Sequence, residues 1–172
     1  ADALTIQENF GNLKGLNVTF IGDGNNVAVS LMFVCSKLGA NFTIASPSGY
    51  ELKPETVKLA ESFAEKSGAS IKLLGAPSEA VKDAHVIYTD TWTSMGQEAE
   101  SKARETLFAN FQVNDKLVAM ARKDVIVMHC LPAHRGQEIT DEVADGPHSV
   151  LFPQAHNRLH AQKAVIVKML EK

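Results

Sequence analysis

Polar residues with ligand-binding or reactive side chains follow three apolar segments of this chain. His129 and Cys130 end one segment, Asp90 ends another, and Asn26 lies just beyond a third. Apolar runs of this length are typical of strands buried in parallel sheets, and open α/β sheets bind ligands beyond the carboxyl ends of their strands. We therefore expect these side chains to meet at one edge of a sheet and to form a small-molecule site.

Asp90 and the residues that follow it suggest recognition of an amino group. A carboxylate at the end of an apolar strand is partly desolvated and favours a cationic partner such as an ammonium group. Helix capping or an ion pair with a neighbouring element would explain Asp90 equally well. Ser94 and Met95 precede a glycine, and this sequence suits either the start of a helix or a loop that closes over a ligand.

Asn25 and Asn26 stand where a helix is expected to begin. One of them is expected to cap the helix, while the other turns its amide toward a ligand, and a carboxylate would suit the partial positive charge there. Gly22 and Gly24 just before them suggest a dinucleotide-binding turn, but Val27 replaces the third glycine of that pattern. No carboxylate ends the next strand either, so the sequence argues against NAD or NADP.

His129 and Cys130 are neighbours on one predicted strand, and neighbours on a strand point to opposite faces. The pair is therefore not expected to act as a base and its nucleophile. Cys130 could equally be a buried small residue, which is common for a free cysteine. Arg135 and Arg158 are the candidate anion-binding residues, although a solvated surface position would explain either of them.

The overall composition restricts the function classes that this chain can have. Its 172 residues, 45% of them hydrophobic, suffice for one compact domain over residues 1–172. A net charge of -3 without long charge runs argues against nucleic acid and membrane partners. The two cysteines lie far apart, and His156 and His160 have no third ligand nearby, so we expect no metal site and a reducing, cytoplasmic location.

Predicted strands and helices alternate along the whole chain. Strands are expected at residues 16–21, 42–45, 71–74, 86–89, 125–128 and 150–152, and the longer helices at residues 1–10, 26–38, 54–67, 97–109 and 157–170. Such alternation implies right-handed crossovers. The sequence therefore predicts an α/β, Rossmann-like doubly wound parallel sheet of five or six strands with helices on both faces.

Four motifs together make the sequence resemble the ornithine carbamoyltransferases. They are GDGNN, DTWTSMGQE, HCLPAHRG and FPQAHNR, and they occur in the order and spacing of that family. The resemblance covers essentially the whole chain and implies its carboxyl-terminal, ornithine-binding domain. The family transfers the carbamoyl group of carbamoyl phosphate to the δ-amine of L-ornithine, without a cofactor, and yields L-citrulline and phosphate. It serves arginine biosynthesis and the urea cycle.

The resemblance assigns roles to individual residues of this chain. It implies that Asn26 holds the carboxylate side of ornithine and that Asp90 binds its α-ammonium group. Cys130 would lie beside the attacking amine, and the carbonyls of Cys130 and Leu131 would accept hydrogen bonds from the carbamoyl nitrogen. Arg158 would polarise the carbamoyl oxygen. Ser94 and Met95 would lie in a mobile loop that closes over the amino acid.

The amino-terminal half of the family has no counterpart in this sequence. That half carries the S-T-R-T-R loop for phosphate and an H-P-x-Q motif for the carbamoyl group, and neither is present here. We therefore expect negligible catalysis by the chain alone. The parent enzyme is expected to be a homotrimer built mainly through the absent halves, and this chain a monomer with exposed apolar faces. A stand-alone amino-acid-binding module is the alternative function, and an acceptor such as putrescine stays open.

Overall fold

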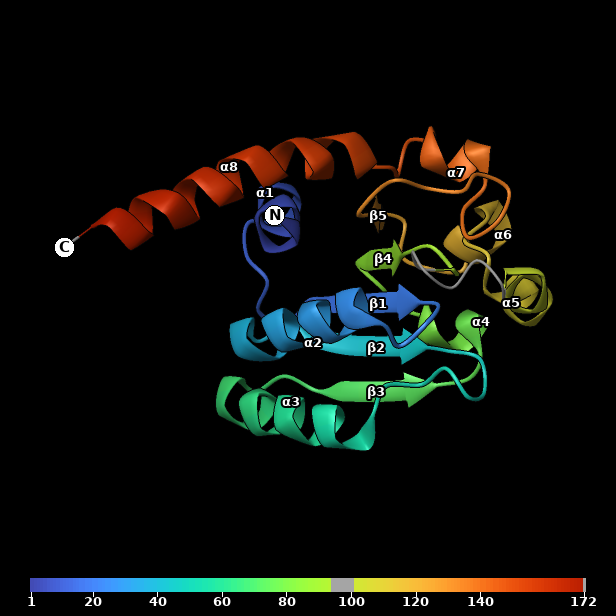
Figure 1. The fold of residues 1–172 in the computed structure, drawn as a ribbon, viewed down its shortest axis with the longest axis horizontal. Coiled ribbons are helices and arrows are strands. Elements are labelled where there is room, and N and C mark those ends of the chain that lie inside the picture. Colours follow the sequence, from blue (N-terminus) through green and yellow to red (C-terminus); the bar gives the residue numbers. More distant parts are fainter. Residues whose placement is uncertain (94–100, 172) are drawn as a thin grey trace.

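The computed structural model describes residues 1–93 and 101–171, which have an α/β fold. A single sheet of five parallel strands has the order β3-β2-β1-β4-β5, as Figure 1 shows. The strands are β1 (Asn17–Ile21), β2 (Asn41–Ala45), β3 (Ile71–Leu74), β4 (Val86–Thr89) and β5 (Ile126–His129). This arrangement confirms the predicted parallel sheet.

Strands β1, β4 and β5 are buried on both faces of the sheet. Every residue of β4 and of β5 is buried, and so are four of the five residues of β1. Phe20 and Tyr88 stack across β1 and β4 with ring centroids 5.6 Å apart. Continuous apolar strands are what a parallel sheet covered by helices on both faces requires.

Helices cover both faces of the sheet (Figure 1). One face is covered by α1 (Asp2–Phe10), α2 (Asn26–Leu38) and α3 (Pro54–Ser67), and α8 (Leu151–Leu170) crosses beside α1 and β5. The other face holds α4 (Pro77–Ala80), α5 (Ser101–Phe108), η2 (Ala109–Phe111), α6 (Asp115–Val118) and α7 (Asp141–Ala144). Among the described helices, we find none with the length and apolar character needed to cross a bilayer.

The sixth strand, predicted for residues 150–152, is absent from the described part of the chain. Ser149 forms an isolated parallel bridge with Val127, and Val150 then becomes the N-cap residue of α8. The helix therefore begins six residues earlier than predicted. Pro153 causes no conflict there, because the first turn of a helix has no partner for its backbone N–H groups.

Capping side chains fix the starts of three helices, the first of them at the predicted asparagine pair. Asn25 accepts hydrogen bonds from the backbone N–H groups of the first turn of α2. Asn114 and Thr140 do the same for α6 and α7. Gly24, before the first of these caps, packs so closely on the backbone of residues 51–52 that a Cβ atom would lie 2.6 Å from the nitrogen of Leu52.

Candidate functional site

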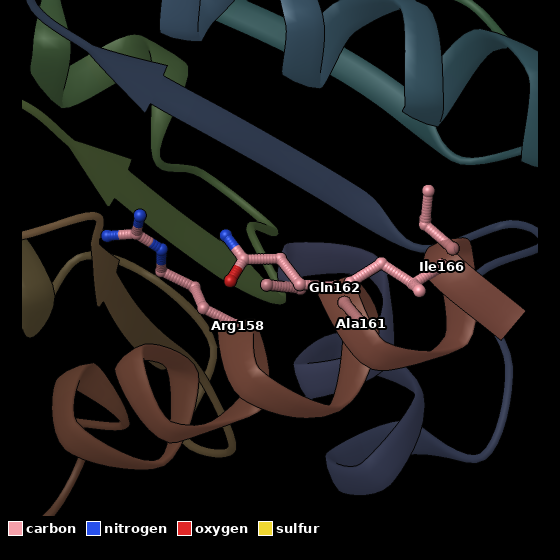
Figure 2. Close-up of a pocket in the computed structure, with 6 residues that line it drawn as sticks. Arg158, Ala161, Gln162 and Ile166 are labelled. Carbon is pink, nitrogen blue, oxygen red and sulfur yellow. The ribbon is translucent and has the colours of Figure 1, made fainter.

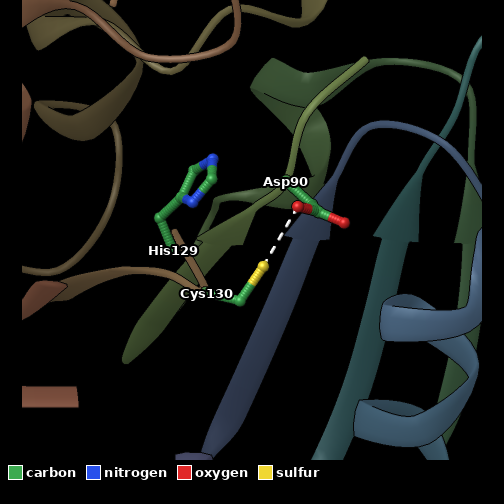
Figure 3. A group of neighbouring side chains, drawn as sticks. All are labelled: Asp90, His129 and Cys130. Atoms are coloured by element: carbon green, nitrogen blue, oxygen red, sulfur yellow. Dashed lines mark hydrogen bonds between the residues drawn. The ribbon is translucent and has the colours of Figure 1, made fainter. Parts of the chain in front are cut away.

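Asp90 lies where three strand ends meet, as the sequence predicted. The strand order reverses between β1 and β4, and ligands of open α/β sheets bind at such a switch point. Asp90 is 9% exposed. Its Oδ2 accepts a hydrogen bond from Asn25 Nδ2 at 2.9 Å, and its Oδ1 accepts one from Cys130 Sγ at 3.1 Å (Figure 3). One carboxylate thus joins the ends of β4 and β5 to the start of α2.

The thiol of Cys130 is a hydrogen-bond donor in this cluster. Burial, the negative charge of Asp90 and the hydrogen bond to Asp90 together raise the pKa of Cys130 from 9.0 to about 12. The thiol is therefore protonated at neutral pH, which makes it a weak nucleophile. This chemistry suits a polar contact with a bound ligand better than covalent catalysis by a thiolate.

His129 is fully buried and belongs to a different set of contacts from Cys130. Its Nδ1 accepts a hydrogen bond from the backbone N–H of Leu131 at 2.9 Å, so its proton resides on Nε2, which donates to Glu138 Oε1 at 3.1 Å. Figure 3 shows the imidazole directed away from the sulfur of Cys130. The structure thus agrees with the prediction that His129 and Cys130 do not act as a dyad.

Metal-ligating atoms of Asp90, His129 and Cys130 lie within 4.8 Å of one another. Both ring nitrogens of His129 already have partners, namely the N–H of Leu131 and the carboxylate of Glu138. The thiol of Cys130 is likewise engaged with Asp90. The described contacts therefore explain this cluster as a hydrogen-bonded assembly, and a metal ion would have to displace at least one of them.

The backbone after His129 presents two carbonyl groups at the strand end. Leu131 has a φ of 57°, the left-handed region that side chains other than glycine rarely adopt. Within residues 1–93 and 101–171, the carbonyl oxygens of Cys130 and Leu131 accept no hydrogen bond. Strained residues of this kind cluster at ligand sites, and unpaired carbonyls can accept hydrogen bonds from a ligand.

The other predicted site residues are less directly connected to Asp90. Asn26 is exposed at the first turn of α2, and its side chain has no hydrogen bond to the described residues. Ser94 and Met95 lie outside the described residues. The structure therefore brings Asp90 and Cys130 together, and it leaves Asn26 exposed next to Asn25 in the chain, with an uncommitted amide.

Arg158 lies on α8 and is exposed to solvent. It forms no hydrogen bond or ion pair with the described part of the chain, and none joins it to Asp90 or Cys130. With Ala161, Gln162 and Ile166 it lines one side of an open cavity of ≈ 540 Å³, and Figure 2 shows these side chains on one face of α8. An exposed guanidinium without a partner is free to bind an anion or a polar ligand.

Arg135, the second candidate for anion binding, is already paired. Its guanidinium donates to Asp141 at 2.8 Å and to both carboxylate oxygens of Asp145 at 2.6 and 2.8 Å. These hydrogen bonds raise the pKa of Arg135. All three side chains are exposed, so the structure explains Arg135 as part of a surface ion-pair network rather than as a ligand site.

Asn25 is the member of the predicted asparagine pair that caps α2, and it also donates to Asp90. Two further polar residues around the site were not identified from the sequence. Glu138, fully buried, binds His129, and Gln154, 2% exposed, accepts a hydrogen bond from the backbone N–H of His129. Gln154 belongs to the FPQAHNR motif, which was the available signal, whereas no pattern in the sequence distinguished Glu138.

Comparison with known proteins agrees with this geometry. Residues 14–169 match the family model described as aspartate/ornithine carbamoyltransferase, Asp/Orn binding domain. The chain is 57% identical over 170 residues to the ornithine carbamoyltransferase of Thermococcus kodakarensis and 55% identical over 172 residues to that of Bacillus subtilis. These alignments cover 99% and 100% of this chain, but 54% of each relative.

Solved structures give the same result. The ornithine carbamoyltransferase of Pyrococcus furiosus superimposes with a TM-score of 0.92 at 56% identity, over 96% of this chain and 53% of that one. The enzyme from Thermus thermophilus superimposes with a TM-score of 0.86 at 41% identity, over 99% of this chain and 53% of that one. The chain thus belongs to the aspartate/ornithine carbamoyltransferase family and corresponds to its Asp/Orn-binding domain.

Proposed function

We propose that this chain is the ornithine-binding half of an ornithine carbamoyltransferase. The reaction transfers the carbamoyl group of carbamoyl phosphate to the δ-amine of L-ornithine and yields L-citrulline and phosphate. The observation that carries this proposal is the position of Asp90, a nearly buried carboxylate beside Cys130 at the switch point of the sheet. Because the chain spans about half the length of the relatives that it matches, the complete activity is part of the proposal.

The amino acid would be held by groups at the ends of β1 and β4. Asp90 would bind the α-ammonium group, which would take over from the thiol of Cys130 as a hydrogen-bond donor. The uncommitted amide of Asn26 would hold the carboxylate side, where the amino-terminal end of α2 favours negative charge. Ser94 and Met95 would close over the bound ornithine.

The carbamoyl group would be held at the end of β5. The carbonyls of Cys130 and Leu131 would accept hydrogen bonds from the carbamoyl nitrogen. Arg158 would polarise the carbamoyl oxygen and stabilise the negative charge that develops on it during attack. The attacking amine must first lose its proton, and a site that excludes water lowers the pKa of an amine.

The chain alone is proposed to bind ornithine weakly and to have negligible activity, because it lacks a phosphate-binding clamp. The remaining half of the enzyme would cover the exposed apolar side chains in the last turns of α8, such as Val165 and Ile166. We propose that the isolated chain is a monomer, with trimer contacts supplied mainly by the other half. Sedimentation of the chain against the complete enzyme tests the oligomeric part of this proposal.

Titration with L-ornithine tests the binding site itself. In a ¹⁵N-labelled sample, we expect saturable shifts of the Asp90 and Cys130 amide signals. Asp90→Asn should abolish these shifts, because the neutral amide keeps the shape but loses the charge that binds the ammonium group. Asp115→Asn, the same change at an exposed position of α6, should leave them unchanged. If the unaltered chain shows no saturable shift, the ornithine-binding proposal is wrong.

A stand-alone amino-acid-binding module is the alternative function. Both functions predict ornithine binding, so titration alone does not separate them. Mixing the chain with a separately produced amino-terminal half distinguishes the two functions. Citrulline synthesis in the mixture supports the transferase, and its absence with both halves folded supports the binding module.

A further inference from the structure

The side-chain amide of Gln154 is buried where helix α8 meets the sheet. Its Oε1 accepts a hydrogen bond from the backbone N–H of His129 at 2.9 Å. Its Nε2 donates to Asp2 Oδ1 and to the hydroxyl of Tyr88, each at 3.0 Å. Because a backbone N–H can only donate, the orientation of the amide is determined by the network, and both of its N–H groups are used.

Asp2 and Tyr88 close this network into a ring. The hydroxyl of Tyr88 donates to Asp2 Oδ2 at 3.3 Å while it accepts from Gln154. Burial, followed by the negative charge of Asp2, raises the pKa of Tyr88, so the hydroxyl keeps the proton that it donates. The ring therefore joins α1, β4 and α8, and through the N–H of His129 it also joins β5.

The position of Gln154 along the chain connects two parts of the candidate site. His129, which it holds, directly precedes Cys130, and Tyr88 lies two residues before Asp90. Arg158 follows Gln154 by four residues on the same helix, which places the two on one face. A shift of this amide would therefore move the strand end and the arginine relative to each other.

We propose that Gln154 is a positioning residue of the carbamoyl transfer, which holds the strand end of Cys130 and the helical turn of Arg158 in a fixed relation. This inference rests on the proposed function, but its physical basis is the hydrogen-bonded ring. The hydrogen bonds described for the Asp90 carboxylate come from Asn25 and Cys130, not from Gln154. It acts through the backbone of His129 and through the direction of α8.

The test is Gln154→Glu, which preserves the acceptor for His129 but removes the donor to Asp2 and places two carboxylates together. Repulsion between the new carboxylate and that of Asp2 should displace the side chain at position 154. The strand end, which this side chain still binds through the N–H of His129, should move with it and take the Cys130 thiol away from Asp90. We expect alkylation of Cys130 by iodoacetamide at pH 8.5 to become about tenfold faster, the effect of lowering a thiol pKa by one unit. Cys35 is fully buried and does not compete.

A second substitution should restore the ring with donor and acceptor exchanged. Combining Gln154→Glu with Asp2→Asn lets the new amide donate to the new carboxylate, so the alkylation rate should return to within about twofold of the original value. The backbone amide signals of Cys130 and Arg158 should move in the single variant and return in the double variant. The control is Gln7→Glu, the same change on the exposed face of α1, which should alter neither readout.

Three results would overturn the proposal. The first is a lower melting temperature of Gln154→Glu with an unchanged alkylation rate, which indicates a purely structural role. The second is a lack of rescue in the double variant. The third result comes from the unaltered chain and applies even if the single variant does not fold. It is hydrogen exchange of the Gln154 side-chain amide as fast as that of exposed Gln162, which would exclude the buried ring. Failure of L-ornithine to bind refutes the proposed function without changing these readouts.

Discussion

The two ends of α8 differ in a way that reverses the usual pattern of a surface helix. Near its start, polar Gln154 and Asn157 are buried, at 2% and 5% exposure. Near its end, apolar Val165, Ile166 and Met169 are exposed at 58%, 57% and 79%. A surface helix normally buries its apolar stripe and exposes its polar residues. In Figure 1 the last turns extend away from the sheet.

This difference shows which end of α8 belongs to the present domain. The start is fixed by specific hydrogen bonds: Asn157 Nδ2 donates to Thr5 Oγ1 at 3.0 Å and to Glu8 Oε2 at 2.6 Å. The last turns form few contacts, and their exposed apolar side chains are typical of a surface that another protein segment covers. Stability of the chain and assembly of the proposed enzyme should therefore depend on different ends of the same helix.

The largest effect on stability is expected at the anchored end. Asn157→Leu should lower the free energy of unfolding by about 2 kcal/mol, because it leaves the acceptors on Thr5 and Glu8 without their donor. Urea denaturation measures this change. Gln162→Leu, an amide-to-leucine change on an exposed turn of α8, serves as the control and should have little effect. Equal losses in the two variants would contradict the distinction between the two ends.

A smaller effect is expected at the strand end beside the anchored turns. Asp90→Asn removes two of the causes that raise the pKa of the Cys130 thiol, while burial, the largest cause, remains. We expect alkylation of Cys130 to accelerate by roughly tenfold at pH 8.5, since about one pKa unit changes the thiolate fraction tenfold. A rate equal to that of the unaltered chain would show that Asp90 does not control this thiol.

The same thiol should make the stability of the chain decrease in alkaline solution. The pKa of Cys130 is about 12 in the folded chain, above its ordinary value of 9.0. A group with a raised pKa stabilises the folded state fully below the lower value, and this contribution disappears as the pH rises from 9 to about 12. Urea denaturation across this range should show a smaller decrease for Cys130→Ser, and parallel curves would contradict the assignment.

The smallest effect on stability is expected at the exposed end. Ile166→Ser should change the free energy of unfolding by no more than about 0.5 kcal/mol, because the side chain is already largely in water. Urea denaturation checks this value. The same variant should weaken association with an amino-terminal half, measured by calorimetry. A loss of stability as large as that of Asn157→Leu would mean that the last turns pack on this domain.

The sequence predicted the parts of the molecule that depend on local patterns. The apolar runs and helix caps identified the strands and most helices, and the strand ends correctly placed Asp90 and Cys130 together. The predicted start of α8 was wrong, because the apolar residues around Val150 are compatible with a strand and with a helix about equally. The partners of Gln154 and Glu138 were not predictable, since those contacts join residues that only the complete fold brings together.

The central claim is that this chain supplies the ornithine-binding half of a carbamoyltransferase and needs an amino-terminal half for activity. The most direct measurement is citrulline formation from L-ornithine and carbamoyl phosphate by the chain alone, by a separately produced amino-terminal half, and by their mixture. We predict negligible activity for each half and restored activity for the mixture, lost again with Asp90→Asn. If no citrulline forms in a mixture in which both halves are folded and associated, the claim is contradicted.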